Sequence, residues 1–141
     1  MSLDGPIPLI LLALGAASLT GCSRPKSIDR ERARSEIRSV RSFAAEAELS
    51  IDFILQGRAT RHYAEAHLAY LEEEVEQSAK ALENVVAGAD AADTVSTCRI
   101  ELDQIVQELS GIRNANGNRD RLISAKSKIQ QIRESLEKAN R

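Results

Sequence analysis

The stretch that decides the fold is residues 91–112, which read AADTVSTCRIELDQIVQELSGI. Its apolar residues recur at spacings of four and three, and the positions between them are mostly polar or charged. These apolar positions are Ala91, Val95, Cys98, Leu102, Ile105, Leu109 and Ile112. Such a repeat forms one apolar stripe along an α-helix and predicts knobs-into-holes packing against other helices.

Three other stretches carry the same repeat. Their apolar positions are Ala33, Ile37, Val40, Ala44, Ala47, Ile51 and Ile54; then Ala64, Leu68, Leu71, Val75, Ser78, Leu82 and Val85; then Leu122, Ala125, Ile129, Ile132, Leu136 and Ala139. Four stripes predict an all-α fold, an antiparallel up-down-up-down four-helix bundle with heptad-like seams. A three-helix or a dimeric variant is the alternative.

The breaks between the stripes contain residues that end one helix and begin the next. Gly57 precedes Thr60, Gly88 precedes Asp90, and an Asn- and Gly-rich run occupies residues 114–118. Glycine permits the left-handed residue that ends a helix, and Thr, Asp or Asn accepts hydrogen bonds from the first N–H groups of the next helix. We expect one domain over residues 29–141, with helices at about 29–55, 61–87, 91–111 and 119–140.

Composition excludes several classes of function. The chain has 141 residues, a net charge of -2 and 3% aromatic residues. The near-neutral balance argues against nucleic-acid binding, and the scarcity of aromatic residues argues against a sugar or base-stacking site. The two cysteines form no C-x-x-C pair, which excludes a zinc ribbon and a thioredoxin-like redox pair.

Charge is distributed unevenly along the chain. The net charge is +4 over residues 23–41, -10 over residues 42–110 and +5 over residues 111–141. In an antiparallel bundle the basic start of the first helix lies beside the end of the second. We therefore expect surface ion pairs between two sets of residues. The basic set is Arg30, Arg34, Arg38 and Arg41, and the acidic set is Glu72, Glu73, Glu74, Glu76 and Glu83.

The beginning of the chain has a different character. Residues 7–21 carry no charge and are largely apolar, but 15 residues are fewer than the roughly 20 that span a bilayer as a helix. A short apolar run followed by small residues is typical of a secretory signal. A buried helix of a cytosolic protein is the alternative, although Pro8 and Gly15 would make it a poor core helix.

The sequence Leu19-Thr20-Gly21-Cys22 closely resembles the lipobox of bacterial lipoproteins. The resemblance implies cleavage between Gly21 and Cys22, a diacylglycerol on Cys22 and an acyl chain on the new amino terminus. Residues 1–21 would then be a signal peptide and residues 22–28 a short tether. By the same resemblance, Ser23 favours an outer-membrane lipoprotein that faces the periplasm.

Few side chains are candidates for chemistry. His62 and His67 lie five residues apart, about 140° around a helix, so they cannot share a metal ion. The best candidate for a ligand or metal site is His67 with Glu48 and Asp52. The plainer interpretation is a histidine that is hydrogen-bonded to a neighbouring acid. Apart from the covalent lipid, we expect no cofactor and no resident metal.

Other side chains are better explained by packing. We expect Cys98 to be a buried packing residue. The four aromatic residues are predicted to lie in the core and at the seam edges rather than to form a binding platform. They are Phe43, Phe53, Tyr63 and Tyr70.

Motifs of nucleophilic catalysis and of phosphate binding are missing from the sequence, so no catalytic residue is predicted. We expect a non-enzymatic, lipid-anchored envelope protein that acts as a structural or protein-interaction module. Its partners would be the membrane and an unknown envelope protein, with no nucleic acid, and it could form a homo-oligomer. The alternatives are a small-ligand or metal-binding bundle built on His67, Glu48 and Asp52, and an accessory subunit of a larger complex.

Overall fold

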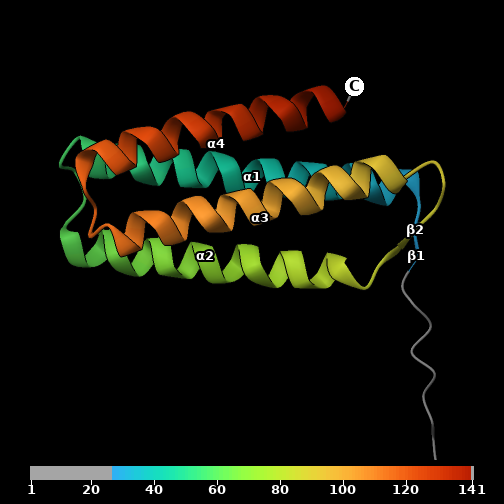
Figure 1. Ribbon diagram of the computed structural model, residues 1–141, viewed down its shortest axis with the longest axis horizontal. Coiled ribbons are helices and arrows are strands. Elements are labelled where there is room, and N and C mark those ends of the chain that lie inside the picture. Colours follow the sequence, from blue (N-terminus) through green and yellow to red (C-terminus); the bar gives the residue numbers. More distant parts are fainter. Residues whose placement is uncertain (1–26, 141) are drawn as a thin grey trace, which may run out of the picture.

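The structure is a computed structural model that describes residues 27–140. Four helices account for most of it: α1 (Arg30–Leu55), α2 (Arg61–Glu83), α3 (Ala92–Asn114) and α4 (Arg119–Ala139). They lie side by side in one bundle (Figure 1). The α1–α2 and α3–α4 connections lie at one end of the bundle, and the α2–α3 connection lies at the other (Figure 1). The prediction of an all-helical fold is confirmed.

Helix starts follow the expected capping residues with one exception. Thr60 caps α2 by accepting a hydrogen bond from the Tyr63 amide at 3.3 Å. Asn118 caps α4 by accepting hydrogen bonds from the backbone amides of Asp120 and Arg121. Gly57 and Gly117 follow α1 and α3 with φ values of +67° and +68°, which favour glycine. The exception is α3, which has no side-chain cap because Ala91, not Asp90, precedes it.

The second helix ends four residues earlier than predicted. It stops at Glu83, and Val86–Ala87 forms a short strand, β2. The strand pairs in parallel with β1, Ser27–Ile28, which the sequence had assigned to the tether. Arg99 of α3 stabilises this end because its guanidinium donates hydrogen bonds to carbonyl groups that the helix leaves free. The acceptors are the carbonyl oxygens of Leu82 at 2.6 and 3.0 Å, Val85 at 3.0 Å and Glu83 at 3.3 Å.

The core consists of the predicted stripes. All seven apolar positions of the third stripe are buried, six of them in α3 and one, Ala91, just before it. The other helices bury most of their predicted apolar positions. Ile28 of β1 joins the same cluster, which ties the start of the described chain to the bundle. Every pair of helices packs together extensively except α2 and α4. Within residues 27–140, the helices are too polar or too short to cross a bilayer.

Candidate functional site

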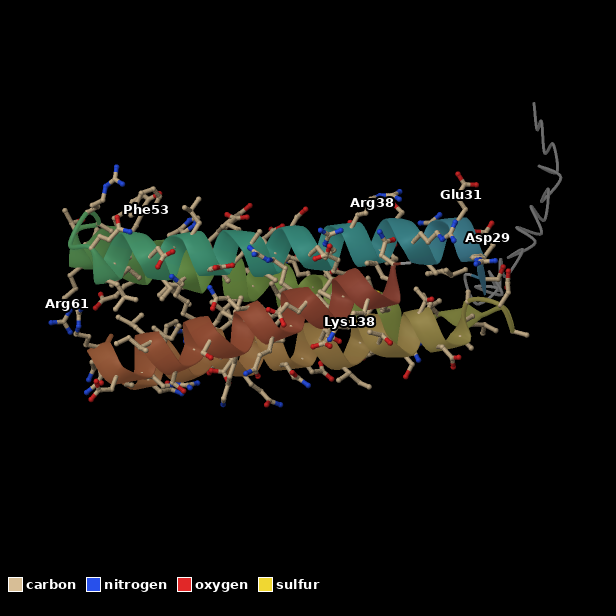
Figure 2. All side chains as sticks on the ribbon, turned by 90° about the horizontal axis from the view of Figure 1, so that it is seen from above. Asp29, Glu31, Arg38, Phe53, Arg61 and Lys138 are labelled. Carbon is tan, nitrogen blue, oxygen red and sulfur yellow. The ribbon has the colours of Figure 1, made fainter. Side chains whose placement is uncertain are left out.

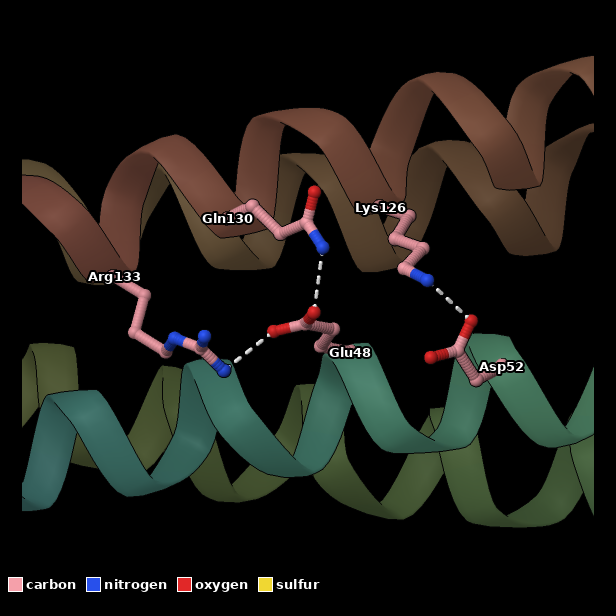
Figure 3. A network of polar contacts seen from close by, with 5 residues as sticks. All are labelled: Glu48, Asp52, Lys126, Gln130 and Arg133. Atoms are coloured by element: carbon pink, nitrogen blue, oxygen red, sulfur yellow. Dashed lines mark hydrogen bonds and ion pairs between the residues drawn. The ribbon is translucent and has the colours of Figure 1, made fainter.

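The carboxylates of Glu48 and Asp52 face α4 (Figure 3). Gln130 donates to Glu48 Oε1 at 2.6 Å, and Arg133 Nη1 lies 2.7 Å from Glu48 Oε2. Lys126 Nζ lies 2.6 Å from Asp52 Oδ1. Both acids of the predicted ligand trio are therefore engaged in holding α4 against α1.

The third member of the trio lies elsewhere. His67 of α2 faces the opposite flank of α1, where its Nε2 lies 3.5 Å from Glu46 Oε1. Its ring stacks on Tyr63, with 5.7 Å between the centroids. The structure does not bring His67 together with Glu48 and Asp52. Glu46, which His67 contacts, and Glu48 are two residues apart on α1, so their side chains point in nearly opposite directions. No group of three potential metal ligands occurs in the part of the chain that the structure describes.

A groove between α1 and α2 surrounds the His67 contact. We call this cavity of about 340 Å³ the α1–α2 groove. It is lined by the end of α1, the α1–α2 connection and the start of α2: Glu46, Leu49, Ser50, Phe53, Ile54, Ala59, Tyr63, Ala64 and His67. Its walls are mainly apolar, and its polar atoms come from Glu46, Ser50, Tyr63 and His67. Ser50 is buried there and donates its hydroxyl hydrogen to the Glu46 carbonyl oxygen at 2.8 Å. An apolar floor with a few polar groups at its edge is the usual composition of a binding pocket.

Apolar side chains extend from this groove onto the surface. Leu49 and Tyr63 in the groove are 56% and 59% exposed, and Phe53 beside them is half-buried. Tyr70, seven residues after Tyr63 on the same face of α2, is 57% exposed. Tyr63 and Tyr70 therefore do not belong to the core, contrary to the sequence-based expectation. The Arg58 guanidinium lies 5.0 Å above the Phe53 ring centroid, so one aromatic face already accepts a cation.

The predicted ion pairs between the start of α1 and α2 do not form. Glu72 instead pairs with Arg113 of α3, with 2.9 Å between Oε2 and Nη1. Arg38 and Arg41 line a shallow surface depression with Arg133 and Glu137 of α4. The basic start of α1 therefore lies beside the end of α4, because α1 packs more closely against α4 than against α2.

Cys98 is fully buried, which confirms its predicted packing role. Burial raises the pKa of its thiol to about 11, and the nearby carboxylates of Glu36 and Glu101 add to the rise. A thiol in this state stays protonated and unreactive at neutral pH. The predicted lipid-attachment and cleavage residues, Cys22 and Gly21, lie outside the described residues.

Comparisons with known proteins add no identity to this geometry. No family model, no curated protein and no solved structure matches the chain.

Proposed function

We propose that the protein is a lipid-anchored, non-enzymatic module of the bacterial envelope that binds another envelope protein. Its fold would be an antiparallel up-down-up-down four-helix bundle, as the alternating ends of the helix connections support (Figure 1). The signal peptide of residues 1–21 is cleaved, and a diacylglycerol and an acyl chain on Cys22 hold the protein on the outer membrane, facing the periplasm. The resemblance of residues 19–22 to a lipobox supports this anchoring.

The geometry supports a defined orientation for such an anchored bundle. Asp29 and Glu31 lie at one end of the bundle, whereas Phe53 and Arg61 lie at the other (Figure 2). The 26 residues of α1 rise about 1.5 Å each, which separates the two ends by about 40 Å. The tether reaches only about 3.5 Å per residue, so the β1–β2 end would stand close to the membrane. The α1–α2 groove would then face away from it.

One observation carries the interaction half of the proposal. Two of the exposed large apolar residues, Leu49 and Tyr63, line the groove together with the half-buried Phe53. Tyr70 lies seven residues after Tyr63 and therefore on the same face of α2. Contiguous apolar surface of this kind marks an interaction site in soluble domains, and tyrosine is enriched where proteins bind each other.

The anchoring half is tested by fractionation. Cys22→Ser should leave the precursor uncleaved and prevent incorporation of labelled palmitate, whereas globomycin treatment of cells producing the wild type should leave the precursor uncleaved but still labelled. The matched control is Cys98→Ser, which leaves the lipobox intact and should not change processing. Unchanged size and unchanged membrane fractionation of Cys22→Ser would refute the anchoring.

The interaction half is tested by site-specific crosslinking in cells. A photoreactive amino acid at position 70 should give a reproducible crosslinked species whose formation is lost with Leu49→Ser. The same group at position 127, on the exposed face of α4, is the control and should give none. If both positions crosslink alike, or if neither does, the groove is not the interaction surface.

A second function is favoured by the His67 pocket: a small-ligand-binding bundle. The site would use His67 with Glu46 and Tyr63, in place of the Glu48 and Asp52 of the sequence-based hypothesis. His67→Ala should abolish ligand-induced thermal stabilisation while leaving the unliganded protein's melting temperature nearly unchanged. Equal behaviour of the two proteins across a panel of metals and small molecules would refute this function.

A further inference from the structure

Three glutamates of this bundle are buried to nearly the same degree. Glu72, Glu101 and Glu108 are 7%, 7% and 6% exposed. Glu72 is paired with Arg113, and Glu108 is paired with both Arg121 at 2.8 Å and Lys128 at 2.9 Å. The side chain of Glu101 has no hydrogen bond and no ion pair with any residue between 27 and 140.

A carboxylate on a mostly buried residue is less well hydrated than one on the open surface, so pairing with a cation is favourable. The neighbours of Glu101 make its position worse. Cys98 lies one turn before it on α3, and the Glu36 carboxylate of α1 acts on the same thiol. Two carboxylates, Glu36 and Glu101, thus act on one thiol, and Glu101 lacks the cation that Glu72 and Glu108 each have.

The heptad spacing shows where that cation is missing. Glu101 lies seven residues before Glu108 on α3, and Ser135 lies seven residues after Lys128 on α4. Lys128 binds Glu108, and Ser135 lines the same cavity as Glu101. Ser135 thus occupies, relative to Glu101, the place that Lys128 occupies relative to Glu108. A hydroxyl group at this place cannot neutralise the carboxylate.

The space beside Glu101 is an open pocket. It has a volume of about 510 Å³ and lies between α3 and α4. Glu108 and Lys128 line it as an ion pair. Its other polar walls are the amide side chains of Gln104, Gln107 and Gln131 and the hydroxyl of Ser135. Each of these groups has an oxygen that can accept a hydrogen bond. The pocket therefore combines one unpaired carboxylate with several neutral acceptors.

We propose that the α3–α4 pocket binds a small molecule through a primary ammonium group that pairs with Glu101. An ammonium has three N–H donors, which suit one carboxylate oxygen together with amide and hydroxyl oxygens. A divalent metal fits the pocket less well. Ca²⁺ requires six to eight oxygen ligands, usually with several carboxylates, and the Glu108 carboxylate is already neutralised by two cations.

Ethanolamine is a suitable probe because it offers one ammonium and one hydroxyl group. Titration of the ¹⁵N-labelled protein should give saturable shifts at the Gln104 and Gln131 side-chain amides, with a Kd of roughly 1–10 mM for so small a ligand. Tetramethylammonium carries the same charge without N–H donors and should give no saturable shift there. Calcium chloride should give none either. Saturation by either control at the same amides, or no saturation by ethanolamine, would overturn the proposal.

Glu101→Gln removes the charge and keeps the shape of the side chain. We expect it to weaken ethanolamine binding at least tenfold and to raise the melting temperature of the unliganded protein by no more than about 2 °C, because the carboxylate borders an open pocket. Asp103→Asn, which removes an exposed charge from the same helix, should change neither quantity. Ethanolamine binding that survives Glu101→Gln would overturn the proposal.

Ser135→Lys is a second variant that does not depend on the first. Its ammonium should pair with Glu101 as Lys128 pairs with Glu108, raise the melting temperature and prevent ethanolamine from binding. A Ser135→Lys protein that still binds ethanolamine with the affinity of the wild type would show that the probe binds elsewhere.

Discussion

The contacts of α4 and the contact between α1 and α2 are built differently. Lys126 and Arg133 connect α4 to acids of α1, and Arg121 and Lys128 connect it to Glu108 of α3. Between α1 and α2, the corresponding contact within the described residues is that of His67 with Glu46, and its 3.5 Å is long. One side of the bundle is closed by charge pairs, and the other is left with an apolar groove.

This difference separates ion pairs that form within the chain from apolar side chains that remain in water. Each ion pair of α4 has both of its partners within the chain, so these charges need no partner from another molecule. Leu49 and Tyr63 in the α1–α2 groove, and Tyr70 farther along the same face of α2, keep more than half of their surface in water. Large apolar side chains clustered in this way gain free energy when another molecule covers them.

The two sides share one core, and the first prediction tests whether they also unfold together. Ile105→Ala removes a fully buried side chain from α3 and should lower the free energy of unfolding by about 2–5 kcal/mol, through lost burial and the cavity left behind. Urea denaturation followed by far-UV circular dichroism measures the loss. Tyrosine fluorescence reports on α2 alone, because both tyrosines lie there.

In the wild type and in the variant, the fluorescence and dichroism transitions should coincide. A tyrosine transition at a lower urea concentration would mean that the open α1–α2 side unfolds before the charge-paired side. The comparison would then describe two cooperative units instead of two surfaces of one unit.

The second prediction concerns the thiol at the centre of that core. The folded pKa of Cys98 is raised to about 11, above that of an unfolded thiol, so the unfolded state loses its proton first as the pH rises. This contribution to stability is complete below about pH 8 and decreases as the pH approaches the folded pKa. Relative to Cys98→Ala, the wild type should lose about 2 kcal/mol between about pH 8 and pH 10.5 in urea denaturation. Parallel curves for the two proteins would contradict this.

The third prediction compares two charge pairs directly. Arg113→Met leaves the buried Glu72 without its cation and should cost about 1–2 kcal/mol. Arg133→Met should cost less, about 0–1 kcal/mol, because Gln130 still donates a hydrogen bond to Glu48. Combining Arg113→Met with Glu72→Gln should recover most of the loss, as measured by thermal and urea denaturation. A larger cost for Arg133→Met would mean that the pairs of α4 stabilise the bundle more than their geometry indicates.

Most of the fold was predictable because the apolar repeat determines which face of each helix is buried. The repeat does not determine which flank of a helix meets which neighbour. Glu46 and Glu48 both border the α1 stripe, and only the closer packing of α1 on α4 directs Glu48 to Arg133 and leaves Glu46 for His67. The sequence-based prediction was therefore right that His67 contacts an acid of α1, but it chose Glu48 on the flank that faces α4 instead of Glu46.

The β1–β2 pair was not predictable for a different reason. Two residues per strand are too few to show an alternating pattern, and Val85 continues the helical stripe up to the residue before β2. The helix ends there because Arg99, 17 residues beyond Leu82, binds its last carbonyl oxygens. Interactions at that distance along the chain depend on the packing of α3 on α2, which the local sequence does not contain.

The smallest expected effect on stability is also the sharpest test of the open groove. Tyr70→Ser and Leu49→Ser should change the free energy of unfolding by less than about 0.5 kcal/mol, because the water that surrounds these side chains in the folded state also surrounds them after unfolding. Ile123→Ser on α4 is the matched control, since Ile123 is 50% exposed and lies away from the groove. All three variants should melt like the wild type, but only the first two should lose the crosslinked species formed from position 63. A loss of more than about 1 kcal/mol in Tyr70→Ser would mean that this chain already uses the tyrosine for its own packing. The groove would then already be packed by side chains of this chain and would need no partner.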